Sequence, residues 1–452
     1  MRRPIIFVTT FFLAAALSAT ENKPQSLLDI YNLALAHDPT LASALNANQA
    51  AQELIEQSKA LYRPVVNFSA TTSASQADIH FKGTGVPFPN GSRSFSGYQY
   101  GVEARQPIFR HQNKVQMDQL HTQVSQADKQ LHLTLQTVML QTTLNYFQVL
   151  MAQDKVTLII AQKAAILRQL EQAKANFDVG NATITDVNEA QSRFDWIAAE
   201  EISNLNALEI AKHELETMIG EVPSNLAAIK TDIKTNTLSQ NLEQWLKVAE
   251  ESNLNIQIQQ DKATLSNQEI ERNQAEHLPT VDAVASYSET YANGSIYGFG
   301  SDISNGTIGL QLQVPIYQGG AISSRVRQAV INKHKAQDDI DITRRQTALA
   351  TQMAYLNLNT SINQIKAYEQ ALNSSQSQLE STQTGYEVGI RTSLDVLNAQ
   401  QQLFAAKRNL LEARYQYLMN IIRLKSAAGI LSDTDLVDIN QQLQLQLPVV
   451  EN

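Results

Sequence analysis

Two hydrophobic patterns divide the chain. In residues 97–105 and 307–313, apolar side chains alternate with small or polar ones, as in a β-strand whose two faces differ. In residues 109–176, which contain neither proline nor glycine, apolar residues recur at steps of four and three. That interval is typical of a helix packed in a coiled coil. The first such residues are Leu120, Val124, Ala127 and Leu131.

The alternating segments predict four strands, at about 64–75, 95–107, 279–289 and 305–315. Strands of eight to ten residues with one apolar and one polar face are typical of transmembrane β-strands, but an ordinary half-buried antiparallel sheet has the same pattern. Segments 76–94 and 289–304, rich in glycine, serine and asparagine, predict loops. Proline suits a change of element, and it marks all four predicted strand–helix junctions, at Pro64, Pro107, Pro279 and Pro315.

The helical segments are unusually long. We predict long helices at about 109–177 and 318–385, each followed by a shorter helix, at about 183–219 and 392–428. At a rise of 1.5 Å per residue, a helix of roughly 65 residues is close to 100 Å long. No globular core is that wide, so these helices must lie against one another. Their polar faces, crowded with Gln, Asn, Ser and Thr, favour a water-filled interior.

The two halves of the chain resemble each other in sequence. Several segments recur about 209 residues later, in the same order and with small differences in loop length. This tandem duplication predicts a first structural repeat at 20–231 and a second at 232–452. The matched pairs are Phe177-Asp178-Val179-Gly180 with Tyr386-Glu387-Val388-Gly389, Thr185-Asp186-Val187-Asn188 with Leu394-Asp395-Val396-Leu397, and Gly220 with Gly429.

The first residues read as an export signal. Arg2 and Arg3 precede an apolar stretch at 5–17, and small residues follow at 18–20. We therefore expect a signal peptide at 1–19, which is too short to be a membrane anchor. The chain has no cysteine, which excludes disulfides, thiolate catalysis and lipid attachment at an N-terminal cysteine. Its net charge of −9, without a basic run, argues against nucleic acid as a partner.

The strand count has a consequence for assembly. Four strands cannot close a barrel, and an open sheet edge has no hydrogen-bonding partner in lipid. Three copies would supply twelve strands and room for an aqueous lumen. The predicted fold class is therefore an α+β membrane protein: a trimeric twelve-stranded β-barrel continued by a long helical barrel. The main alternative is a secreted trimeric coiled-coil adhesin or spacer without a pore.

On these residues the chain resembles the TolC family of trimeric outer-membrane efflux and secretion channels. The resemblance covers essentially the whole mature chain. It implies a homotrimer in outer-membrane lipid of a Gram-negative bacterium, with a periplasmic tunnel, no enzymatic activity and no cofactor. It also implies a periplasmic adaptor and an inner-membrane RND or ABC transporter as partners. The carriers are the duplicated segments, His277-Leu278-Pro279-Thr280, Leu312-Gln313-Val314-Pro315-Ile316-Tyr317-Gln318-Gly319-Gly320, and Ile390-Arg391-Thr392-Ser393.

The resemblance also implies a gate where the paired helices turn. Residues that match Thr185, Asp186, Tyr386 and Arg391 tie neighbouring helices together in the family, and a carboxylate that matches Asp395 forms a ring of charge at the constriction. Close relatives often carry a second aspartate one turn later, but Asn398 stands there in this chain. The adaptor would contact the two tip turns. Those turns contain Val179, Gly180, Val388 and Gly389.

Several of these residues have a simpler structural explanation. Thr183 stands three residues before Asp186, and Thr392 three before Asp395, which is the spacing of a helix capping box. Gly180 and Gly389 would supply the left-handed residue that ends each long helix. The eight histidines do not cluster, so we expect no metal site, and no catalytic motif stands out. The nature of the cargo is not encoded in any of these patterns.

Overall fold

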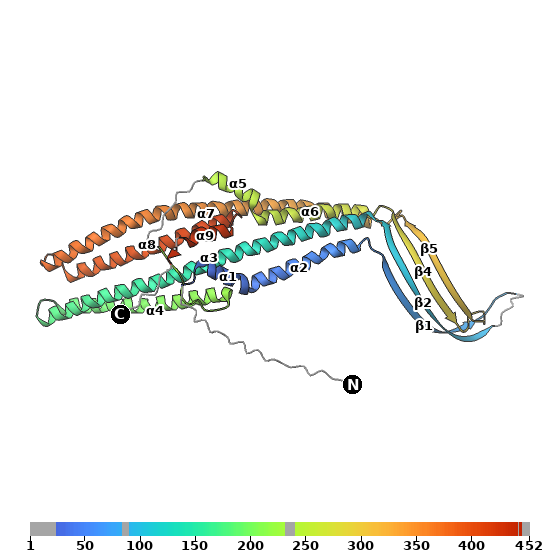
Figure 1. Cartoon of the computed structure of the whole chain (residues 1–452), viewed down its shortest axis with the longest axis horizontal. Coiled ribbons are helices and arrows are strands. Elements are labelled where there is room, and N and C mark those ends of the chain that lie inside the picture. The colour runs from blue at the N-terminus through green and yellow to red at the C-terminus, as the bar shows by residue number, and fades with distance from the viewer. Residues whose placement is uncertain (1–23, 84–89, 231–239, 442, 445–452) are drawn as a thin grey trace, which may run out of the picture.

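The protein is described by a computed structural model over residues 24–83, 90–230, 240–441 and 443–444. The expected signal peptide at 1–19 and the C-terminal tail beyond residue 444 lie outside the described residues. The molecule is elongated (Figure 1). A sheet forms one end, and helices run from it to two helix–helix turns at the other end.

The sheet is antiparallel, with the strand order β1-β2-β4-β5. Strands β2 and β4 pair in the middle and so join the two halves of the chain, while β1 and β5 each have one side without a strand partner among the described residues. Unpaired edges of this length need a partner to be stable. The strands are β1 (Val65–Ile79), β2 (Gly91–Phe109), β4 (Thr280–Ala292) and β5 (Ser301–Gln313).

The register gives the sheet two different faces. One row across the four strands is apolar and consists of Val66, Ala104, Ala285 and Ile308. The next row is polar and consists of Asn67, Glu103, Ser286 and Thr307. No layer of the described chain covers the apolar face, where Ile308 is 90% exposed and Leu310 76%. An ordinary half-buried sheet would cover that face, so the structure favours strands that face lipid.

The strands are longer than the hydrophobic pattern predicts. The prediction that 76–94 forms a loop is wrong at both ends, because Gln76–Ile79 pair with Gly91–Ser94. The predicted loop at 289–304 is wrong at both ends as well, since β4 continues to Ala292 and β5 begins at Ser301. Backbone hydrogen bonds extend both hairpins without needing apolar side chains. Pro107 also differs from the prediction. It lies inside β2, next to a register shift, rather than between strand and helix. A β-bulge is one of the few places where a sheet tolerates proline.

The helical part repeats one plan. In the first half α1 and α2 precede two strands, and α3 and α4 follow them; α5, α6, α7 and α8 have the same order in the second half. Helix lengths of 11, 22, 68 and 36 residues against 11, 22, 67 and 35 agree with a duplication. The bounds are α1 (Leu27–His37), α2 (Pro39–Ala60), α3 (His111–Asp178), α4 (Ile184–Ile219), α5 (Leu242–Ser252), α6 (Leu254–Ala275), α7 (Ala321–Glu387) and α8 (Ser393–Ala427).

The main core lies midway along the molecule. There α1 and the short helix α9 (Asp433–Asn440) pack near the long helices (Figure 1), and two short strands, β3 (Ala228–Ile229) and β6 (Leu443–Gln444), pair with each other. Tyr146, Phe147 and other large side chains are fully buried in this cluster. The core therefore fixes the middle of the long helices and leaves two helical hairpins, α3/α4 and α7/α8, to extend beyond it (Figure 1).

Polar contacts set the register nearer the sheet. Asp128 of α3 accepts hydrogen bonds from Asn48 and Gln52 of α2, at 2.7 and 2.9 Å. The next residue, Lys129, pairs with Asp261 of α6 at 2.5 Å. Two successive residues of α3 therefore reach the two helices on either side of it. Because each pair closes in only one register, these contacts resist sliding of the helices past one another.

Candidate gate at the helical tips

Both helical hairpins turn through a left-handed glycine. Gly180 has φ 80° and Gly389 has φ 77°, as the sequence predicts. The amide of Asn181 donates to the carbonyl of Asn176 at 2.7 Å, which closes the turn in the way typical of a helix C-terminus. The second tip repeats this arrangement. The residues before the glycines, Val179 and Val388, are 69% and 65% exposed, so each tip presents an apolar side chain to the outside.

A capping box begins each returning helix, and this prediction is confirmed. Asp186 accepts from the amide and the hydroxyl of Thr183, and the Asp186 amide donates back to that hydroxyl. Asp395 makes the same contacts with Thr392. Thr185 lies exposed in the first turn of α4. The two tips therefore have equivalent backbones, and differences in their chemistry come from side chains.

Asp395 is held in its charged form. Hydrogen bonds from the backbone and side chain of Thr392, helped by the nearby positive charge of Arg391, lower the pKa of this carboxyl below its ordinary value. Hydrogen bonds to an ionised carboxylate stabilise that form. Asp395 therefore carries a full negative charge at neutral pH. The helix dipole at the start of α8 also favours this charge.

The tyrosine and arginine of the predicted gate make other contacts within one chain. The hydroxyl of Tyr386 accepts a hydrogen bond from the side-chain amide of Asn176 at 3.1 Å, which joins α7 to α3. Arg391 packs over Gly385, where an added Cβ would lie 2.7 Å from the Arg391 Cγ. Over the described part of one chain, no hydrogen bond or ion pair joins Tyr386 or Arg391 to Thr185 or Asp186. Such a contact would have to involve a neighbouring copy.

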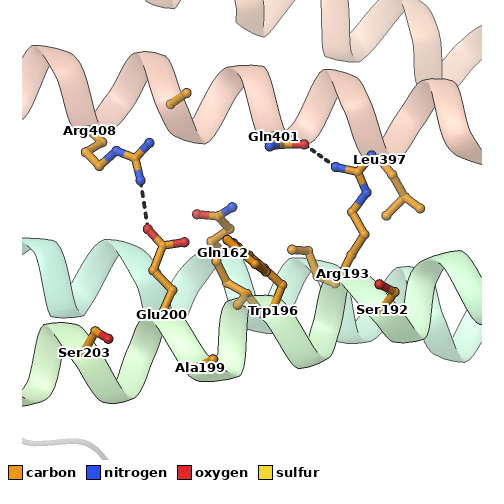
Figure 2. Close-up of a pocket in the computed structure, with 13 residues that line it drawn as sticks. Gln162, Ser192, Arg193, Trp196, Ala199, Glu200, Ser203, Leu397, Gln401 and Arg408 are labelled. Atoms are coloured by element: carbon orange, nitrogen blue, oxygen red, sulfur yellow. Dashed lines mark hydrogen bonds and ion pairs between the residues drawn. The ribbon is translucent and has the colours of Figure 1, made fainter.

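Asn398 is engaged by an arginine that the sequence analysis missed. The Nη2 atom of Arg193, on α4, donates to Asn398 Oδ1 at 2.7 Å. The Nη1 atom of Arg193 donates to Gln401 (Figure 2). Two turns further on, Arg408 pairs with Glu200 at 2.9 Å. No sequence signal identifies these partners, because the match depends on how α4 and α8 sit side by side.

The hydrogen bonds of Arg193 and the ion pair of Arg408 with Glu200 cross a groove between the hairpins. This groove has a volume of about 800 Å³, and Gln162 of α3 and Trp196 of α4 lie along it (Figure 2). Trp196 is 75% exposed. Separate polar side chains span the groove, and beside them Leu397 of α8 packs in a small apolar cluster with Leu170 and Ala173 of α3 and Ala190 of α4.

Helix α8 carries two parallel seams: the residues of the first recur at steps of three and four, and those of the second at steps of three, seven, four and three. The seam toward α7 is apolar and buried, whereas the seam toward α3 and α4 has several polar residues beside the buried Leu397. Each hairpin is therefore a stable coiled coil, and the contact between hairpins is a more hydrated one. The apolar seam is Val396, Ala399, Leu403, Ala406, Leu410, Ala413 and Tyr417. The polar seam is Asn398, Gln401, Arg408, Glu412 and Tyr415, which contact Arg193, Glu200, Lys155 and Asp154.

The described residues contain no group of three or more His, Asp or Glu side chains arranged to hold a metal ion. Over the same residues, no helix combines the length and apolar character needed to cross a bilayer.

Comparison with known proteins identifies the family. The family model described as "Outer membrane efflux protein" matches residues 30–221 and 245–430. The outer membrane protein TolC of Vibrio cholerae is 32% identical over 439 residues, covering 96% of this chain and 98% of that protein. The chain belongs to the outer membrane efflux protein family. The two matched segments fall in the two proposed repeats, 20–231 and 232–452.

Other relatives extend this result. The proteases secretion protein PrtF of Dickeya chrysanthemi is 28% identical and covers 100% of this chain and 97% of that protein. The crystal structure of the outer membrane protein VceC from Vibrio cholerae has a TM-score of 0.73, with 18% identity over 89% of this chain and 96% of that chain. The efflux family and this fold confirm the predicted fold class for one protomer and the location in the outer membrane. The family and the fold are both those of channel proteins.

Proposed function

We propose that three copies of this efflux-family chain close one channel, the exit duct for cargo that crosses the cell envelope. One observation carries the proposal. The sheet has four strands, an exposed apolar face and two unpaired edges, so it is incomplete alone in lipid. Pairing β5 of each copy with β1 of the next removes every edge. Twelve strands then enclose the polar face of the sheet as a water-filled lumen.

The tip residues act as the gate in this proposal. Asp395 and Asn398 line the constriction, while Thr185, Asp186, Tyr386 and Arg391 link helices there. The contacts within one chain support a role for Tyr386, which already bridges α7 and α3. Arg391 extends from the turn beside Asp395 and is available to a neighbouring copy. A periplasmic adaptor would contact Val179, Gly180, Val388 and Gly389, and so shift the gate.

The partners in this proposal follow from the relatives. Two relatives are named as a proteases secretion protein and an alkaline protease secretion protein, and the matching family model describes outer membrane efflux proteins. We propose that an adaptor couples the tips to an inner-membrane transporter of the RND or ABC class. Cargo passes from that transporter into the helical tunnel and leaves through the barrel.

Two measurements test the proposal. Light scattering of the purified, detergent-solubilised protein should give the mass of a trimer, and planar bilayers should show discrete conductance steps when the trimer is added. The separated monomer fraction should produce none. A monomer that conducts ions, or a trimer that never conducts in any state, would contradict the proposal and favour a structural coiled coil without a pore.

A further inference from the structure

We infer that Arg193 is a selectivity-determining residue, which places a positive charge in the constriction and offsets the negative ring of Asp395. The inference deepens the proposed function and rests on it. The ligand class concerned is small permeant ions and charged cargo. A ring of aspartates alone would favour cations. An arginine ring beside it would leave the mouth open to anionic solutes as well.

The charge of Arg193 is not neutralised by its partners. Both acceptors, Asn398 and Gln401, are neutral amides. Among the described residues no carboxylate lies within 4.0 Å of the Arg193 guanidinium, although Glu189 is one turn away on the same helix. Arg408, which spans the same groove, differs because Glu200 pairs with it at 2.9 Å. The two arginines span the same groove, but only the charge of Arg408 is neutralised by a carboxylate.

The hydrogen bond fixes where the charge lies. Asn398 follows Asp395 by three residues on α8, so the two side chains share one face, one turn apart. The Arg193 Nη2 atom lies 2.7 Å from Asn398 Oδ1. If Asn398 lines the constriction, the guanidinium does so too. Charges one turn apart lie within the screening length of about 8 Å at physiological salt, so an ion passing Asp395 also feels Arg193.

The side chain at position 398 is consistent with this reading. An aspartate at 398 would form an ion pair with Arg193 and cancel its charge, whereas the asparagine holds the guanidinium in place and leaves it charged. Each subunit then contributes two carboxylates, Asp186 and Asp395, and two arginines, Arg193 and Arg391, to the gate, so negative charge does not outweigh positive charge. The hydrogen bond of Arg193 to Asn398 therefore holds a positive charge at the constriction without neutralising it.

Reversal potentials across a KCl gradient test the inference in full-length trimers. Arg193→Gln removes one positive charge per subunit, and Asn398→Asp adds one negative charge, so both should raise the ratio of cation to anion permeability by a similar factor, roughly threefold or more. Arg193→Lys should keep the wild-type ratio. Arg408→Gln is the matched control, since it removes an arginine from the same groove away from Asp395, and it should leave the ratio unchanged.

The outcomes separate the inference from the proposed function. A ratio that rises for Asn398→Asp and stays at wild type for Arg193→Gln overturns the inference. So does an equal rise for Arg408→Gln, which would point to a general loosening of the groove. Wild-type trimers that form no channel would contradict the proposed function instead. If Arg193→Gln trimers do not assemble, Arg193→Met takes its place, since its unbranched side chain fills the groove without a charge, and a wild-type ratio in that variant overturns the inference.

Discussion

Asp154 is a half-buried carboxylate of α3 that faces α8. It accepts a hydrogen bond from the hydroxyl of Tyr415 at 2.6 Å, and burial raises its pKa above the ordinary value. The folded chain therefore binds this proton more readily than the unfolded chain does. As pH rises from the ordinary value through the raised pKa, the folded state loses stability, and the loss persists at neutral pH.

This leads to a prediction for Asp154→Asn. The variant should remove that part of the pH dependence and unfold at a higher temperature than wild type at neutral pH, followed by circular dichroism in detergent. Tyr415→Phe keeps the carboxylate and takes away its donor, so it should lower stability by about 1–3 kcal/mol. A wild-type pH profile in Asp154→Asn would show that the raised pKa does not affect folding.

The glycine turns give a second prediction. Gly180→Val and Gly389→Val should each destabilise a tip by about 1–3 kcal/mol, because a β-branched residue at positive φ is strained. Export should fall while the heat-resistant trimer on gels remains. Gly309→Val is the control, since a Cβ there meets open space and its φ lies outside the left-handed region. Normal export by both tip variants would mean that the turn conformation is not required.

At this scale the sequence predicts what is local. Capping boxes and left-handed glycines depend on residues three or four apart, so spacing alone identifies them. The contacts of Tyr386 with Asn176 and of Arg193 with Asn398 join residues about 210 apart. They depend on the rotation and rise of one helix against another, which no local pattern specifies.

The two seams of α8 give a prediction for that element. Leu403 is 4% exposed in the apolar seam, so Leu403→Ala should cost about 2–5 kcal/mol of local stability. Gln401→Ala removes one hydrogen bond across the groove and should cost about 0.5–1.5 kcal/mol. Hydrogen exchange of α8 amides should resolve the difference. Equal protection in the two variants would mean that the seams are energetically alike.

Helices are the elements that the sequence predicts best. Sixty or more residues without proline or glycine leave few alternatives, and the observed ends of α3 and α7 lie within three residues of the predicted ones. Strand ends are less predictable. The hairpin of β1 and β2 extends through polar residues, because its backbone pairing does not depend on which side chains it carries. Pro107 does not mark the end of β2, because a β-bulge accommodates the proline inside the strand.

The gate gives a prediction for the whole channel. Arg391→Ser with Tyr386→Phe should raise single-channel conductance and antibiotic leakage in a strain without the pump. Each lost contact is partly exposed and worth about 1 kcal/mol, but three copies act together. Asp395→Ala should leave the channel closed and lower its cation preference. A double variant that conducts like wild type would mean that these residues only cap and pack.

The open edges of β1 and β5 have a genetic consequence. Each copy pairs its edge strands with those of both neighbours, so a subunit whose β5 cannot pair leaves an open edge in any trimer that contains it. When normal and defective chains are made in equal amounts and mix freely, only roughly one ring in eight contains none of the defective kind. Such an allele should therefore be dominant over the wild type. An allele that only weakens the gate should instead let every trimer assemble. Each trimer should then leak in proportion to its number of altered subunits.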